Sequence, residues 1–146
     1  MTDAPRLFTV DEANRVLPLV RPIVRDLLAV HTEWRHAVEQ FELAIAIDPG
    51  TPTEAAPVES PVALAARMEA EAHAVRIQEL LGELAALGCS FKGFEGGLVD
   101  FLSLRDDHPV YLCWKHGEDS VSHWHDIDGG FGGRHPIDSH LFSEMT

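Results

Sequence analysis

The fold is decided by residues 97–126, which read GLVDFLSLRDDHPVYLCWKHGEDSVSHWHD. Apolar residues recur here with a period of two, and Val, Tyr, Phe and Trp are frequent, which is typical of β-strands. The connections between the apolar segments are too short for parallel crossovers, so neighbouring strands must run antiparallel. We therefore predict a small antiparallel sheet of three to four strands within residues 89–128. The candidate strands are 89–95, 98–104, 110–115 and 121–126.

The segment before this sheet has the periodicity of a helix. Residues 9–12, Thr-Val-Asp-Glu, have the form of a capping box, in which each end side chain bonds a free backbone N–H. Apolar residues then recur at heptad spacing, which predicts a first helix over residues 9–47. Because Pro18 and Pro22 each remove a backbone donor, we expect a kink or a short separate first turn near 18–22.

A second helix follows after a proline-rich loop at 48–59. Ser60 is a good N-cap in front of Pro61, and Gly88 is placed to end the helix, so we predict a helix over residues 60–88. Helices followed by strands, without alternation, indicate an α+β fold in which a long antiparallel helical hairpin packs with the sheet. We expect one domain over residues 1–146, with a Gly-rich loop and tail at 129–146.

The charge balance excludes several classes of partner. Eleven Lys and Arg against 24 Asp and Glu give a net charge of −13, which leaves no basic surface for DNA or RNA. Anionic membrane surfaces are disfavoured for the same reason, and no apolar run approaches the roughly 20 residues that cross a bilayer. The N-terminus lacks the layout of a signal peptide. We therefore expect a cytoplasmic protein in which Cys89 and Cys113 are free thiols.

The apolar stripe of the first helix is wider than the seam of a simple two-stranded coiled coil. Two long helices with such a stripe need more than each other to cover it. Either the sheet packs over them, or two protomers pair into a four-helix bundle, so we expect a homodimer.

Four segments of the chain resemble those of a known family. They are the opening FTVDEAN (8–14) with LPLV (17–20), GLVDF (97–101), VYLCWKHGE (110–118) and WHDIDGGFGGR (124–134). They resemble the bacterial family catalogued as domain of unknown function 2203, and the resemblance covers nearly the whole chain. That family has no established activity, substrate or cofactor. The resemblance implies an aromatic residue elsewhere in the family where this chain has His123.

Histidines near the end of the sheet indicate a metal site. On a strand, His123 and His125 point to the same face, about 7 Å apart at the backbone, close enough to share one ion. The third ligand would be a carboxylate, with Glu118 the nearest and Asp100 and Asp126 as further candidates. Imidazole with carboxylate suits zinc or non-haem iron(II). We therefore predict a divalent transition-metal site formed by His123, His125 and Glu118, with Asp100 in reserve.

Two polar residues have competing interpretations. Asp100 lies among apolar neighbours, so in a buried position its charge must pair with a cation such as Lys115 or Arg134, bind a metal, or be neutralised. Arg134 ends the glycine-rich segment GGFGGR (129–134). With free backbone amides it could form an anion-binding site for a carboxylate or phosphate, or it could pair with a neighbouring aspartate.

Two further constellations have a chemical and a structural interpretation. Folding the hairpin at its loop brings His31 level with His73. The two histidines are a secondary candidate metal pair, or they are half-buried histidines that are hydrogen-bonded to their neighbours. Cys113 lies two residues before Lys115 on a strand, so both side chains point to the same face, and His125 could approach them from a neighbouring strand. Lys115 and His125 could then activate the Cys113 thiol as a nucleophile. The structural interpretation is that Cys113 only packs, as a cysteine in such a strand usually does.

The function predicted from these patterns is metal binding on the C-terminal sheet. If the site is catalytic, we expect metal-activated water or oxygen to act on a small molecule. The alternative is a non-catalytic acidic dimeric scaffold that docks another protein through its Trp-, Gly- and His-rich region.

Overall fold

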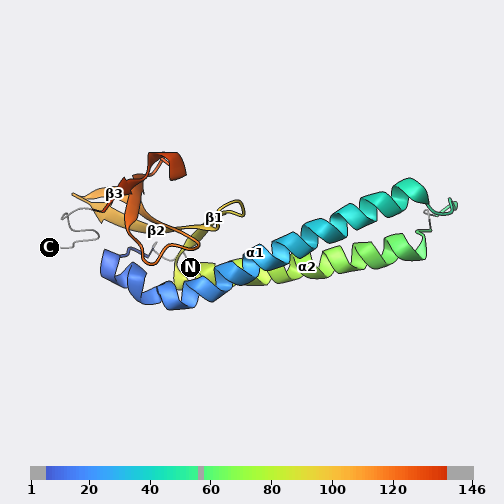
Figure 1. Ribbon diagram of the computed structural model, residues 1–146, viewed down its shortest axis with the longest axis horizontal. Coiled ribbons are helices and arrows are strands. Elements are labelled where there is room, and N and C mark those ends of the chain that lie inside the picture. Colours follow the sequence, from blue (N-terminus) through green and yellow to red (C-terminus); the bar gives the residue numbers. More distant parts are fainter. Residues whose placement is uncertain (1–5, 56–57, 138–146) are drawn as a thin grey trace. The chain divides into compact units, whose positions relative to one another are not determined.

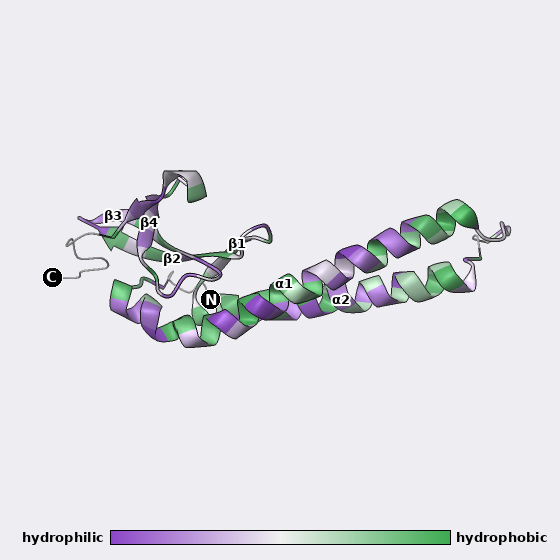
Figure 2. Cartoon of the chain, in the orientation of Figure 1, coloured by the Kyte–Doolittle hydropathy of each residue, from purple (hydrophilic) through white to green (hydrophobic). Residues whose placement is uncertain are grey.

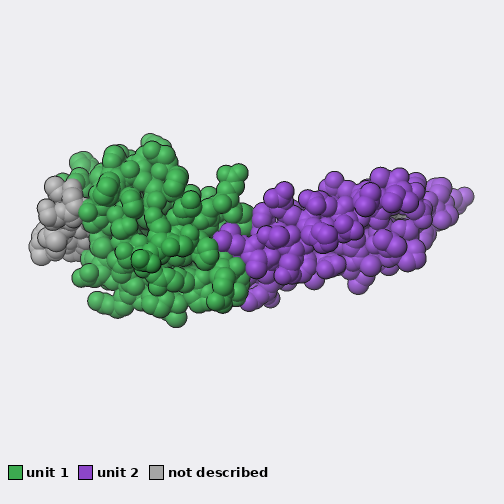
Figure 3. Space-filling model, viewed as in Figure 1, with its two compact units in different colours: residues 1–26, 81–146 green, residues 27–80 purple. Residues whose placement is uncertain are grey.

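The computed structural model describes residues 6–55 and 58–137, which fall into two compact units (Figures 1 and 3). Residues 27–80 form one unit, and residues up to 26 together with those from 81 onward form the other. Helices α1 (Val10–Ile47) and α2 (Pro61–Leu87) each contribute to both units. The expectation of one domain stays a prediction. Among the described residues, no helix combines the length and the apolar character that crossing a membrane requires.

The predicted capping box opens α1. The backbone N–H of Thr9 donates to Glu12 Oε1 at 2.9 Å, and the Glu12 N–H donates to Thr9 Oγ1 at 3.0 Å. This exchange satisfies two of the donors that a helix start leaves free. Pro18 and Pro22 lie inside one uninterrupted helix, so α1 has no separate first turn, and its ribbon bends over this N-terminal stretch (Figure 1).

Local signals also set both ends of α2. Ser60 Oγ accepts a hydrogen bond from the Ala63 N–H at 3.2 Å, as an N-cap does. At the other end Gly88 has φ +93°, a conformation that glycine adopts without the Cβ penalty, and its N–H donates to the Ala85 carbonyl.

The unit of residues 27–80 is a helical hairpin with an alanine-rich core. Its buried apolar residues are Leu27, Ala37, Ala44, Ala63, Ala66, Ile77 and Leu80. Larger apolar side chains such as Leu43, Ile45, Met68 and Val75 are exposed, and Figure 2 shows hydrophobic residues mixed with hydrophilic ones along both helices. The predicted homodimer stays a prediction.

The other unit contains an antiparallel sheet with five strands in chain order, so the α+β fold is confirmed with one strand more than expected. The strands are β1 (Ser90–Gly93), β2 (Leu98–Arg105), β3 (His108–Lys115), β4 (His123–Asp126) and β5 (His135–Pro136). The extra strand β5 lies in the segment predicted as loop and tail. It pairs with β4 through only two residues, too few to give a sequence pattern.

Strands β2 and β3 form a longer hairpin than the sequence predicted. Asp106 and Asp107 have φ of 51° and 65°, and Arg105 pairs with His108. Two central residues with positive φ are characteristic of a type I′ turn, whose twist matches that of the strands. The segment predicted as a five-residue loop is therefore a two-residue turn, and both strands extend to it.

One face of this sheet forms the core of its unit. Val99, Phe101, Leu112 and Trp114 are at most 1% exposed, and the Phe8 ring packs edge-on against Phe101 with ring centroids 5.2 Å apart. The Asn14 side chain of α1 makes two hydrogen bonds with the backbone of Val121. Its Oδ1 accepts from the Val121 N–H at 2.7 Å, and its Nδ2 donates to the Val121 carbonyl. The start of α1 is therefore fixed to the sheet by apolar and polar contacts together.

A buried hydroxyl provides a first test of this packing. Ser103 is fully buried, and its Oγ donates to the Phe8 carbonyl at 2.5 Å. Ser103→Ala should lower the free energy of unfolding by about 1–3 kcal/mol, because the carbonyl loses its buried donor. Urea unfolding measures the change. Ser122→Ala, at an exposed position, is the control and should have little effect.

Candidate metal centre

Three chemically different side chains meet on the opposite face of the sheet. Asp100 of β2 lies directly across from Cys113 of β3. His125 of β4 lies directly across from Tyr111, which is two residues before Cys113 on β3. Side chains two residues apart share a face, so all three point the same way. They are 4%, 1% and 3% exposed. Their ligand atoms lie within 4.8 Å of one another, and no other such cluster of three or more is found in residues 6–55 and 58–137.

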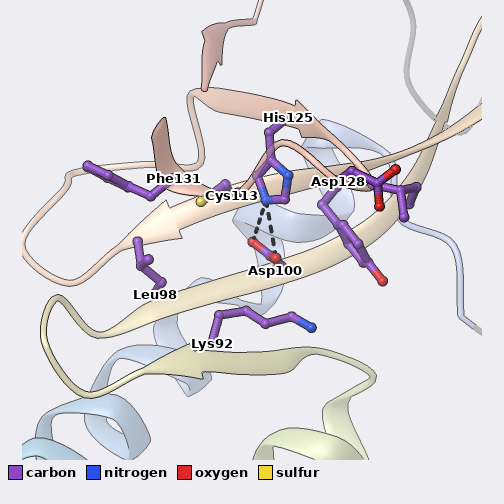
Figure 4. A pocket seen from close by; sticks show the side chains of 10 residues that line it. Lys92, Leu98, Asp100, Cys113, His125, Asp128 and Phe131 are labelled. Carbon is purple, nitrogen blue, oxygen red and sulfur yellow. Dashed lines mark hydrogen bonds and ion pairs between the residues drawn. The ribbon is translucent and has the colours of Figure 1, made fainter. Parts of the chain in front are cut away.

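The hydrogen bonds of His125 locate its protons. Nδ1 lies 2.7 Å from the Asp126 carbonyl oxygen, which can only accept, so Nδ1 carries a hydrogen. Nε2 lies 3.1 and 3.2 Å from the two Asp100 oxygens (Figure 4). A carboxylate also only accepts, so this contact needs one more proton, shared between Nε2 and Asp100. Asp100 thus pairs with His125, whereas the sequence favoured Lys115 or Arg134.

Cys113 is held as a neutral thiol in this setting. Burial raises its pKa to about 12, the charge of Asp100 adds to the rise, and Arg134 acts in the opposite direction. The Arg134 guanidinium also donates to the Cys113 carbonyl at 3.1 Å. A thiol with so high a pKa is a poor nucleophile. A bound metal ion, however, deprotonates a coordinating thiol outright.

A pocket of about 290 Å³ opens beside this cluster (Figure 4). Lys92, Leu98, Tyr111, Ile127, Asp128, Gly130 and Phe131 complete its lining. The loop after β4 passes close above His125, because a Cβ at Gly129 would lie 3.3 Å from the His125 Cβ. Glycine at this position lets the loop form one wall of the pocket.

Two predicted ligands lie in a separate network. Glu118 Oε1 accepts from the Arg134 guanidinium at 2.7 Å and from the Lys115 backbone N–H at 2.7 Å. His123 Nδ1 lies 3.8 Å from Glu118 Oε2. Partial burial opposes ionisation of Glu118, but the bonds from Arg134 and Lys115 outweigh it and lower its pKa. Of the predicted set, the structure brings together Asp100 and His125 and leaves Glu118 and His123 outside the cluster.

Arg134, predicted as an anion site, is the partner of Glu118. Its side chain is 10% exposed, and it donates to Glu118 and to the Cys113 carbonyl from the same nitrogen. The anion that this guanidinium binds is therefore a carboxylate of the same chain. Arg134 therefore lies beside the cluster and binds the backbone of β3 at Cys113.

The two hairpin histidines have different surroundings in the unit of residues 27–80. The His31 ring stacks on Trp34 with centroids 5.8 Å apart. His73 Nε2 lies 3.7 Å from carboxylate oxygens of Glu33 and of Glu69. Neither histidine belongs to a metal-ligand cluster of three or more residues in the described part of the chain, and a metal pair formed by the two stays a prediction.

The residue of this cluster that the sequence analysis did not consider as a metal ligand is Cys113. The sequence pattern indicated only a nucleophile or a packing residue at this position. The available signal was the Asp106-Asp107 turn, because a two-residue turn there places Cys113 directly opposite Asp100.

Comparison with known proteins identifies the family of this chain. A family model described as an uncharacterized conserved protein (DUF2203) matches residues 6–137. The chain belongs to this family. The comparisons with curated proteins and with solved structures gave no match. The match to DUF2203 includes the whole Asp100–Cys113–His125 cluster, and the segments GLVDF, VYLCWKHGE and WHDIDGGFGGR each supply one of its residues.

Proposed function

We propose that this protein binds a zinc ion through Asp100, Cys113 and His125, with the remaining coordination position facing the pocket. The convergence of a carboxylate, a thiol and an imidazole nitrogen within 4.8 Å, all almost fully buried, carries this proposal. Ligand atoms of a tetrahedral zinc site lie roughly 3.3–3.8 Å apart, as its bond lengths require. The 3.1 Å contact between His125 and Asp100 needs to lengthen by only a few tenths of an ångström.

The orientation of His125 supports a metal site over a thiol nucleophile. In a Cys–His–Asp triad one ring nitrogen faces the thiol and the other faces the carboxylate. Here Nε2 faces Asp100 and Nδ1 faces the Asp126 carbonyl, so neither nitrogen is placed to take the Cys113 proton. A histidine that donates its Nδ1–H to a backbone carbonyl and directs Nε2 inward has the arrangement common among metal ligands.

The donor set favours zinc over non-haem iron. Iron(II) oxygenases use two histidines and one carboxylate, whereas this cluster has one histidine and a thiol. Thiolate and imidazole are ligands that zinc accepts together with a carboxylate. Free thiols persist in reducing compartments, so a zinc-thiolate site also supports the proposed cytoplasmic location.

Three protein ligands leave a position for water, as in catalytic zinc sites. A zinc ion lowers the pKa of a bound water and so supplies a nucleophile near neutral pH. The pocket of about 290 Å³ lies at the lower end of the range for ligand sites and suits a small molecule. We therefore propose metal-activated water acting on a small molecule.

Metal analysis of the protein tests this proposal. Protein purified without an affinity tag or added metal should contain close to one zinc per chain, and the metal-free form should bind zinc with a Kd below about 1 μM. Cobalt substitution should give a thiolate-to-cobalt charge-transfer band. Cys113→Ala should remove that band and weaken zinc binding at least about tenfold.

The second buried thiol provides a matched control. Cys89 is 5% exposed, and burial raises its pKa to about 11, but it lies outside the cluster. Cys89→Ala should keep both the zinc and the cobalt band. A folded, metal-free protein that binds zinc no more tightly than Cys113→Ala does would overturn the proposal and favour the non-catalytic scaffold.

A further inference from the structure

The pocket beside the cluster has one cationic side chain in its lining, Lys92 of β1. Its ammonium lies 5.5 Å from the centroid of the Tyr111 ring. Across residues 6–55 and 58–137, no carboxylate lies within ion-pair distance of it. This contrasts with Arg134, which Glu118 already neutralises. Lys92 therefore has its charge available for a ligand.

The electrostatic balance of the pocket limits the charge of that ligand. In the zinc-bound form of the proposed site, the ion and its two anionic ligands, Asp100 and Cys113, sum to zero. The remaining charged side chains in the lining are Lys92 and Asp128. Figure 4 shows the two on different sides of the pocket. One ammonium with an aspartate nearby suits a single negative charge better than the double charge of a phosphate.

The rest of the lining is suited to an apolar body. Leu98, Tyr111 and Phe131 present aliphatic and aromatic surface, and Phe131 is 46% exposed at the pocket wall. In Figure 4 Phe131 and Leu98 lie on the side of the cluster opposite Asp128. Small-molecule sites combine such apolar walls with a few polar groups that fix orientation.

We propose that the pocket binds a small monocarboxylate, with its carboxylate on the Lys92 ammonium and its apolar body against Tyr111 and Phe131. The placement of that body next to the metal rests on the proposed zinc site. The contact with Lys92 does not, because this side chain lies outside the ligand cluster. Lys92 is thus a specificity residue, and the substrate class is a small organic acid.

Titration with benzoate, monitored by heteronuclear NMR, tests this inference on the zinc-loaded protein. Benzoate should bind in the pocket and shift the resonances of Tyr111 and Phe131, whereas benzamide, its neutral isostere, should bind at least tenfold more weakly. Lys92→Met keeps the aliphatic stem at an exposed position and should weaken benzoate binding at least tenfold. Its zinc affinity should equal that of the wild type.

The controls separate this inference from the zinc site. Asp128→Asn should leave benzoate binding unchanged or tighten it, since it removes the opposing charge. Equal binding of benzoate and benzamide, or unchanged benzoate binding in Lys92→Met, would overturn the inference while zinc binding stands. If the wild type binds no zinc, the same titration on the metal-free protein still decides whether Lys92 binds the carboxylate. Tighter binding of inorganic phosphate than of benzoate would also overturn it.

Discussion

Asp100→Asn is expected to weaken zinc binding by more than about 100-fold, beyond the 10–100-fold that changes around a ligand typically cost. The amide has no negative charge to offer a metal. Its NH₂ can donate to a neutral His125 Nε2 and so replace the proton that Asp100 and His125 share. The fold should therefore persist, with a loss below about 1.5 kcal/mol. Competition with a chromophoric chelator measures the affinity, and urea unfolding of the metal-free protein measures the stability.

Two variants make this result specific. Asp100→Ala should lose zinc equally and also lose about 1–3 kcal/mol of stability, because it leaves Nε2 of His125 buried without a partner. Glu118→Gln, the carboxylate first predicted as a ligand, should keep the zinc affinity of the wild type. A loss of zinc in Glu118→Gln with normal binding in Asp100→Asn would show that the ligand set is wrong.

The helices could be predicted from the sequence because their signals are local. The Thr9–Glu12 capping box and the Ser60 cap each satisfy a backbone donor within three residues, and the cap at Gly88 depends on one positive φ. Tertiary contacts do not enter these features. The strand β5, in contrast, depends on a tertiary contact, because His135 pairs with Trp124 only after the glycine-rich loop has closed. Nothing in a two-residue segment containing proline indicates a strand.

The register of β2 and β3 shows where sequence reasoning stopped. Alternation gave the strands and their faces, but register depends on the turn between them. Treating Arg-Asp-Asp-His-Pro as a loop left the register open. A turn centred between Asp106 and Asp107 fixes it and sets Asp100 opposite Cys113. Aspartate reaches positive φ more readily than most residues, yet two in succession are less common than Asn-Gly or Asp-Gly.

The candidate site could be predicted only in part for the same reason. The period of two placed His123 and His125 on one face, but it could not say which carboxylate each ring meets. That choice depends on Arg134, which follows the glycine-rich loop and forms an ion pair with Glu118. Asp100 is then the carboxylate that pairs with His125. Contacts across a closed loop are properties of the folded chain, not of any local pattern.

The affinity for zinc is expected to rise about tenfold per pH unit between about pH 6 and 8. Zinc binds the deprotonated ligands, so each proton displaced adds about tenfold per unit. One proton comes from the Cys113 thiol, whose pKa burial raises to about 12, so it is present throughout this range. Affinity measured by chelator competition at several pH values gives the slope.

Calorimetry in buffers of different ionisation enthalpy counts the same protons independently. At least one proton released per zinc would agree with ligation by Cys113, whose raised pKa keeps the free thiol protonated. A slope near zero would contradict ligation by a buried thiol altogether, because a group with a raised pKa cannot bind zinc without losing its proton.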